Sequence, residues 1–166
     1  GILVLGASEG SYKKRHLVPF GEYLPFDHAL RGLINFFNIP MSTLTPGPQN
    51  QPLINIHHLL FGASICYEVA YPSLIWHQAA QANILINISD DSWFDHSIAA
   101  SQQLQMSQMR ALETGRPMIA VNNNGETALI SPKGEITKFL PADKIGVLRG
   151  TVTGYTGATP LLKLIS

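Results

Sequence analysis

The chain has 166 residues, of which 45% are apolar and 8% aromatic, so it is long and apolar enough to build the core of one ordinary domain. Only 13% of the residues are charged, and 11 basic side chains balance 11 acidic ones. This balance lacks the basic excess of nucleic-acid-binding proteins, so we expect no nucleic-acid partner. The single cysteine, Cys66, excludes an intrachain disulfide and a cysteine-rich metal site.

The two ends of the sequence indicate a piece of a longer protein. The chain begins without Met, directly in the strand-like residues 2–5, and stops in residues 160–166 just as apolarity rises. Its start lacks the basic region and cleavage site of a signal peptide. No run approaches the roughly 18 to 20 apolar residues of a membrane span.

Short apolar runs rich in β-branched residues predict the strands. They lie at 2–5, 53–56, 60–65, 84–88, 118–122, 127–131 and 147–152. Two segments predict helices, namely 71–80, with Pro72 near its start, and 97–114, which ends before Gly115. Because buried strands alternate with helices, we expect an α/β fold.

Turn sequences shape the rest of the chain. Asn122 to Gly125 and Ser131 to Glu135 separate extended segments, which predicts a hairpin or meander beside the α/β part. Residues 40–52 carry four prolines and a glycine, so they predict a loop.

Cys66 directly follows the predicted strand 60–65 and precedes a turn into a helix. Reactive groups of α/β folds lie at this carboxyl edge of the sheet, and a thiol with a cation or base nearby forms a nucleophilic thiolate. The alternative is a buried cysteine that only fills core space. Position alone leaves the two interpretations in equal balance.

Three charged residues are candidates to assist Cys66. Lys14 offers an ammonium to a thiolate and a developing oxyanion, although a basic cluster such as 12–16 is more often a solvated loop. Glu22 stands between prolines and apolar residues, where desolvation suits proton transfer; surface exposure is the equal alternative. Glu68 is expected either to orient a lysine or to cap the following helix.

Two further groups invite a binding interpretation. Trp93 and Phe94 follow the predicted strand 84–88, where they either line an apolar acyl pocket or cap the core. His57-His58 and Asp90-Asp91 are poor metal sites, because neighbouring strand residues point to opposite faces and two carboxylates are too few for calcium. We therefore expect no metal, and a turn at Asp90-Asp91.

Four motifs together resemble the apolipoprotein N-acyltransferase family of the nitrilase (carbon–nitrogen hydrolase) superfamily, over about residues 1 to 160. The lysine before His-Leu and the Cys-Tyr-Glu after a strand are shared across the superfamily, and the string from His16 to Tyr23 narrows the resemblance to the acyltransferases. The motifs are Tyr12-Lys13-Lys14-Arg15-His16-Leu17-Val18-Pro19-Phe20-Gly21-Glu22-Tyr23, Ile65-Cys66-Tyr67-Glu68, Asp91-Ser92-Trp93-Phe94 and Met109-Arg110-Ala111-Leu112-Glu113.

The resemblance implies a nitrilase-like α-β-β-α sandwich, of which residues 1–153 are the C-terminal part, while 154–166 lead to a membrane helix beyond this chain. It implies a Glu-Lys-Cys triad. Lys14 and Cys66 match the triad lysine and cysteine, and the triad glutamate has no counterpart here, since Glu9 is too close to Lys14. Supporting and substrate-binding positions are matched by Glu22, Tyr67, Glu68, Trp93 and Phe94.

The resemblance also implies a two-step reaction without a cofactor. Cys66 takes a fatty acyl chain from a phospholipid as a thioester, and the N-terminal amine of a diacylglyceryl-lipoprotein then takes the chain as an amide. The implied location is the bacterial inner membrane, reached through segments outside this chain, with the catalytic domain facing the periplasm. The alternatives are a soluble nitrilase-like amidase with water as acceptor, and a fragment that is inactive because it lacks the glutamate.

Three positions depart from the family pattern. Asp90 stands where Asn is commoner, Asp95 where Gly is expected, and Gln103 near a frequent His. An aspartate tolerates positive φ better than most residues, so these departures concern details of the site rather than the family.

Overall fold

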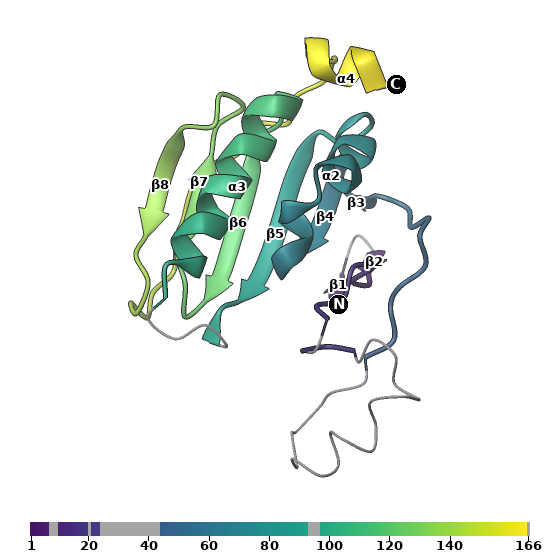
Figure 1. The fold of residues 1–166 in the computed structure, drawn as a ribbon. Helices are drawn as coiled ribbons and strands as arrows, with labels where there is room; N and C mark the ends of the chain where they lie inside the picture. The colour runs from purple at the N-terminus through teal and green to yellow at the C-terminus, as the bar shows by residue number, and fades with distance from the viewer. Residues whose placement is uncertain (7–9, 20, 24–43, 93–96, 166) are drawn as a thin grey trace.

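The computed structural model describes residues 1–6, 10–19, 21–23, 44–92 and 97–165, and its centre is a six-stranded sheet (Figure 1). The strand order is β3-β4-β5-β6-β7-β8. These strands are β3 (Ile54–Ile56), β4 (Leu59–Ile65), β5 (Ile84–Asp90), β6 (Met118–Asn123), β7 (Thr127–Ile130) and β8 (Ile136–Leu140). A separate two-stranded sheet pairs β1 (Ile2–Val4) with β2 (Gly10–Tyr12).

The middle of the large sheet is parallel and its edges are antiparallel. β4 pairs parallel with β5, and β5 with β6, whereas β6, β7 and β8 form an antiparallel meander. Two connections cross from one parallel strand to the next: the 3-10 helix η1 (Cys66–Ala70) with α2 (Pro72–Ala79), and α3 (Ala99–Thr114). Both helices cover the same face of the sheet (Figure 1). The predicted α/β fold with a flanking meander is confirmed.

Local sequence explains where the helices begin and end. Pro72 is the first residue of α2, a position at which its missing N–H costs no hydrogen bond. α3 ends at Gly115, whose left-handed φ of 62° lets its N–H reach the carbonyl of Ala111. Residues 44–52 form a loop as expected, and the rest of that prediction, 40–43, lies outside the described residues.

The sheet packs on both faces. The larger apolar cluster joins α2 and α3 to the sheet through residues such as Ile75, Leu85 and Met118. A smaller cluster on Tyr12, Ile54 and Ala63 joins β2 to the edge of the large sheet. As a consequence, the N-terminal segment that carries Lys14 is anchored beside β4, the strand that ends at Cys66.

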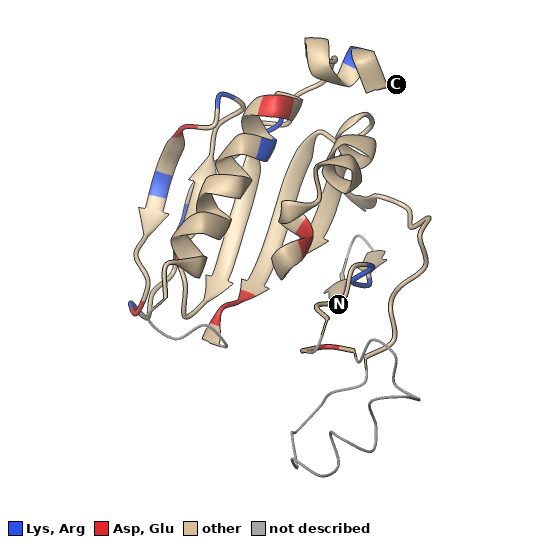
Figure 2. Ribbon diagram, in the orientation of Figure 1, with Lys and Arg blue, Asp and Glu red and all other residues tan. Residues whose placement is uncertain are grey.

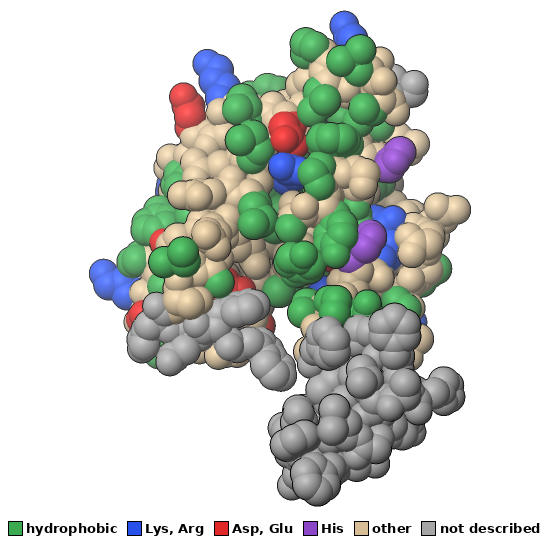
Figure 3. Space-filling view, in the orientation of Figure 1, with side chains coloured by type: hydrophobic (Ala, Val, Ile, Leu, Met, Phe, Trp, Pro, Cys, Tyr) green, Lys and Arg blue, Asp and Glu red, His purple; other side chains and the backbone are tan. Residues whose placement is uncertain are grey.

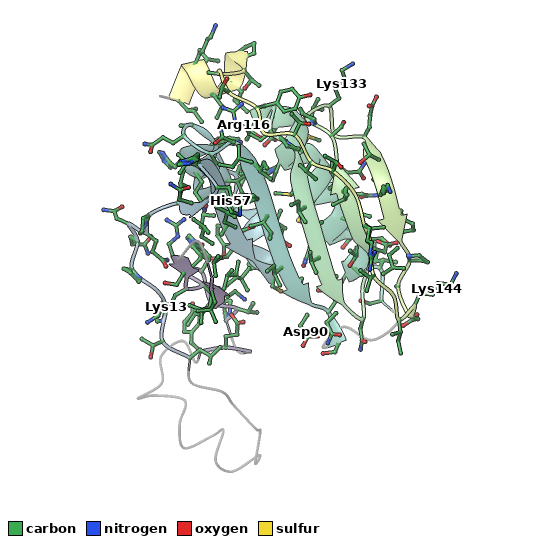
Figure 4. The ribbon with its side chains drawn as sticks, turned by 180° about the vertical axis from the view of Figure 1, so that it is seen from behind. Lys13, His57, Asp90, Arg116, Lys133 and Lys144 are labelled. Carbon is green, nitrogen blue, oxygen red and sulfur yellow. The ribbon has the colours of Figure 1, made fainter. Side chains whose placement is uncertain are left out.

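The strand predicted at residues 147–152 is wrong. This segment crosses the strands on the face opposite α2 and α3 (Figure 4), so its backbone runs in the wrong direction to join the hydrogen-bonded ladder. Its glycines allow the crossing, because a Cβ on Gly150 would overlap Leu129 and one on Gly154 would press on Asn83. β-branched composition predicted an extended chain correctly, but not its direction.

The chain ends in the short helix α4 (Pro160–Ile165), where Leu162 is buried in the larger apolar cluster. Within the described residues, no helix combines the length and apolar character needed to cross a bilayer. The division at residue 153 stays a prediction.

Candidate active site

Cys66 lies at the sharp turn where β4 passes into η1. Its φ is 54°, a left-handed backbone conformation that is uncommon for a residue with a side chain. Strained backbone of this kind clusters at functional sites, where a strand-to-helix turn presents a nucleophile. The thiol is partly exposed and belongs to neither apolar cluster.

A cavity of about 300 Å³ opens beside Cys66. Tyr67 and Val69 continue its wall along η1, Gln103 and Met106 reach it from α3, and most of its lining is apolar. The complete lining is Val18, Cys66, Tyr67, Val69, Ala99, Gln102, Gln103 and Met106. A hydrocarbon chain is therefore a suitable ligand for this space.

Glu68 fastens the Lys14 segment to the Cys66 turn. It is fully buried, and Oε1 accepts hydrogen bonds from the backbone N–H groups of Arg15 at 2.6 Å and His16 at 3.0 Å. Oε2 accepts from the Tyr12 hydroxyl at 3.0 Å and the Ile65 N–H at 2.8 Å. Glu68 thus caps η1 and also orients the lysine segment, through its backbone rather than through the ammonium.

Lys14 is buried and paired with Glu22. Its Nζ lies 2.7 Å from Glu22 Oε1, and only 9% of the side chain is exposed, so the solvated loop considered for this residue is not formed. Glu22 Oε2 accepts the N–H of Val18, a residue that also lines the Cys66 cavity. The Lys14 carbonyl accepts the N–H of Gly47, which holds the backbone in place. Val18 therefore connects the pair to the cavity.

Tyr67 is 43% exposed and belongs to an aromatic group at the mouth of the site. Its ring meets Tyr71 edge to face, with centroids 5.3 Å apart, and Tyr71 stacks on His16 at 4.3 Å. These contacts join η1 to the segment after Lys14 a second time. Burial raises the pKa of Tyr71, so its hydroxyl stays neutral at physiological pH.

Charges are sparse on the helices around this site (Figure 2). The fourth motif supplies one pair on α3, Arg110 and Glu113, joined at 3.2 Å. On the face that carries α2 and α3, the few charged side chains lie among apolar ones (Figure 3). Glu113 also accepts the Trp76 indole N–H at 2.9 Å and, through its carbonyl, the hydroxyl of Thr159. Burial lowers the pKa of Arg110. This motif ties α2, α3 and the C-terminal segment together.

The acidic pair lies at the end of β5, and the turn predicted there is wrong for Asp90, which is the last strand residue and pairs with Asn123. Asp91 is buried and accepts hydrogen bonds from the Ser89 hydroxyl at 2.7 Å and from the side-chain amide of Asn122. Hydrogen bonds from Ser92 lower the pKa of the exposed Asp90. Trp93 and Phe94, expected to line an acyl pocket, lie outside the described residues, as do Glu9 and Asp95.

The interpretation of His57 and His58 as strand residues is wrong. They form the two-residue turn between β3 and β4, since Ile56 pairs with Leu59 and both histidines have positive φ. Within the described ranges, no group of three or more His, Cys, Asp or Glu residues has the arrangement of a metal site.

Sequence reasoning missed Tyr12 and Asn87 as members of the site. Tyr12 donates to Glu68, and the side-chain amide of Asn87 donates to the Cys66 carbonyl at 3.2 Å. A signal for Asn87 was present, because it is the polar residue inside the apolar run of β5. Buried amides need hydrogen-bond partners, so an amide inside a buried strand indicates a specific contact.

The site thus combines a cysteine at a strained turn of an α/β sheet with a buried lysine–glutamate pair that is connected to its cavity through Val18. The carbon-nitrogen hydrolase model matches residues 2–160, and the chain belongs to this family.

The more particular likeness comes from curated relatives. The chain is 51% identical over 163 residues to the apolipoprotein N-acyltransferase of Azotobacter vinelandii and 49% identical to that of Pseudomonas aeruginosa PAO1. Each match covers 98% of this chain and 32% of the relative, so the chain spans about a third of their length. The resemblance stated from the motifs is confirmed.

Solved structures support the fold alone. An amidase from Nesterenkonia sp. superposes with a TM-score of 0.57 at 20% identity, covering 74% of this chain and 46% of that one. A carbon-nitrogen hydrolase from Helicobacter pylori G27 superposes with a TM-score of 0.54 at 20% identity, covering 61% and 43% of the two chains.

Proposed function

We propose that the intact protein containing this chain transfers a fatty acyl group from a phospholipid to the N-terminal amine of a diacylglyceryl-lipoprotein. The observation that carries this proposal is the apolar cavity beside the strained Cys66. The names of the relatives, apolipoprotein N-acyltransferases, supply the substrate class. We also propose the location that the motif resemblance implies, the bacterial inner membrane with the catalytic domain facing the periplasm.

In the first step of the proposed reaction, the Cys66 thiolate attacks the ester carbonyl of the phospholipid. The carbon–sulfur bond forms, the ester carbon–oxygen bond breaks, and the lysophospholipid leaves with a proton. Lys14 stabilises the negative charge that develops on the carbonyl oxygen, and Glu22 fixes its ammonium. The acyl chain occupies the apolar cavity.

In the second step, the lipoprotein amine attacks the thioester. The amide bond forms, the carbon–sulfur bond breaks, and Cys66 regains its proton. A covalent intermediate suits this chemistry, because two large lipid substrates use one site in turn and the thioester stays reactive enough for an amine.

The fate of a labelled acyl chain tests the proposed function. The intact protein is incubated with a phospholipid that carries a labelled fatty acid and with a diacylglyceryl peptide that has a free N-terminus. We expect the label on the peptide amine, and none with Cys66→Ser. Label that appears only as free fatty acid would instead support the soluble amidase alternative, which uses water as acceptor.

A further inference from the structure

The left-handed backbone of Cys66 requires support from its surroundings. A non-glycine residue at a φ of 54° is disfavoured, and it persists only where several contacts hold it. On the N-terminal side, Glu68 holds the N–H of Ile65. The carbonyl of Cys66 itself needs a separate partner, and that partner comes from the neighbouring strand.

Asn87 of β5 supplies this partner. It is buried, and its Nδ2 donates to the Cys66 carbonyl at 3.2 Å and to the Ser64 hydroxyl at 2.9 Å. One amide therefore holds both residues that flank Ile65. Ser64 pairs with Asn87 in the parallel register, so the amide arrives at the turn by the geometry of the sheet.

The orientation of the amide is fixed as well. Its Oδ1 faces the Nε2 of Gln103 on α3 at 3.5 Å, which leaves the NH₂ group directed at Ser64 and Cys66. Gln103 also lines the Cys66 cavity. Every polar atom of the Asn87 side chain thus has a partner, and two of the three partners border or form the candidate site.

Core packing does not explain an asparagine at this position. The neighbouring β5 residues Leu85, Ile86 and Ile88 are apolar, and an apolar residue would be easier to bury than an amide. The hydrogen bond to the Cys66 carbonyl explains why an amide occupies this position.

We propose that Asn87 is a positioning residue, which holds the Cys66 turn in its left-handed conformation so that the thiol faces the acyl cavity. The inference rests on the proposed function in one respect, that Cys66 is the nucleophile. It adds a residue that acts through Cys66 without touching the substrate.

The test measures the rate at which iodoacetamide alkylates Cys66 in the folded intact protein at one fixed pH. Mass spectrometry follows the peptide that contains Cys66, so other cysteines do not interfere. In Asn87→Leu we expect the alkylation rate to fall about tenfold, because a relaxed turn withdraws the thiol from the cavity.

Asn83→Leu is the matched control. Asn83 lies just before β5, at its far end from Cys66, and its amide also holds backbone groups, the N–H of Leu60 and the carbonyl of Tyr155. This control should lower stability while leaving the alkylation rate of the folded protein unchanged. An alkylation rate in Asn87→Leu equal to that of the wild type would overturn the proposal.

A second variant and a second measurement complete the test. If Asn87→Leu does not fold, the smaller and polar Asn87→Ser is measured in its place, with the same expected loss. Thioester formation from phospholipid is measured on the same samples. If the wild type forms no thioester but the variant is alkylated more slowly, the positioning role of Asn87 stands and the proposed acyltransferase function is refuted. If variant and wild type form the thioester equally, the acyltransferase function stands and the positioning role is refuted.

Discussion

Glu68 shows how one buried side chain joins two distant parts of the sequence. Its carboxylate accepts four hydrogen bonds, from the Tyr12 hydroxyl and the backbone of Arg15, His16 and Ile65. The first three donors belong to the Lys14 segment and the fourth to the Cys66 turn. A carboxylate suits this position because it accepts at both oxygens and donates at neither.

Glu68→Gln tests this connection. The amide keeps the size of the side chain but directs an NH₂ group at donors, so buried N–H groups lose their acceptor. We expect the free energy of unfolding to fall by about 2 to 3 kcal/mol, measured by urea denaturation. Glu135→Gln, at an exposed position of the β7–β8 turn, is the matched control and should change stability little. Equal effects of the two substitutions would contradict the role given to Glu68.

The buried contact between Tyr12 and Glu68 makes the free energy of unfolding depend on pH. Burial, followed by the charge of Glu68, holds the pKa of Tyr12 well above its usual value of 10.0. A raised pKa means that the folded state favours the neutral phenol. The resulting stability is complete below pH 10 and is lost as the pH rises further, because the unfolded chain ionises first.

Tyr12→Phe removes this dependence. At neutral pH we expect the variant to be about 1 kcal/mol less stable than the wild type, since the hydrogen bond to Glu68 is lost. The difference should shrink as the pH rises above about 10, where only the wild type loses the contribution of Tyr12. Denaturation curves across that range measure it, and a constant difference would show that Tyr12 does not titrate as described.

Among individual residues, the sequence identified those that carry family motifs, namely Cys66, Lys14, Glu22 and Glu68. It could not identify Tyr12 or Asn87, whose partners lie 56 and 21 positions away. Hydrogen bonds of that span depend on strand register, which local sequence patterns do not specify.

Among the helices and strands, the β3–β4 hairpin has a strained backbone at its turn. His57 and His58 have φ values of 48° and 68°, and a turn with two positive φ residues prefers Asn-Gly. Replacing the two histidines by Asn-Gly should raise the free energy of unfolding by about 1 kcal/mol. His58→Ala provides the opposite control, because alanine tolerates positive φ less well than histidine, and it should lower stability. Thermal or urea unfolding that ranks the variants otherwise would contradict this account of the turn.

Strands β3 to β7 of the large sheet were the most predictable part of the fold, whereas β8 was not predicted. β4 and β5 are buried on both faces, so their residues form continuous apolar runs between turn signals. Residues 147–152 have a similar composition but stay mostly exposed and cross the sheet without joining it, with Gly150 in close contact with Leu129. Composition therefore predicts extended chain more securely than it predicts a hydrogen-bonded strand.

In the whole molecule, the sheet brings the separated motifs to one place. The Lys14 segment packs against the edge of the sheet, the Cys66 turn ends β4, and Asn87 arrives from β5. The apolar cavity opens between η1 and α3 at this point. The roles that the family resemblance implies for these residues stay predictions, while the hydrogen bonds that hold Cys66 became visible only in the structure.

The central claim is that Cys66 carries the acyl group, and one measurement tests it directly. The intact protein is exposed to phospholipid, and the mass of the Cys66 peptide is determined before and after a lipopeptide amine is added. The account predicts an increase equal to one fatty acyl group, which disappears when the amine is present. An unmodified Cys66 in protein that demonstrably binds phospholipid would contradict it.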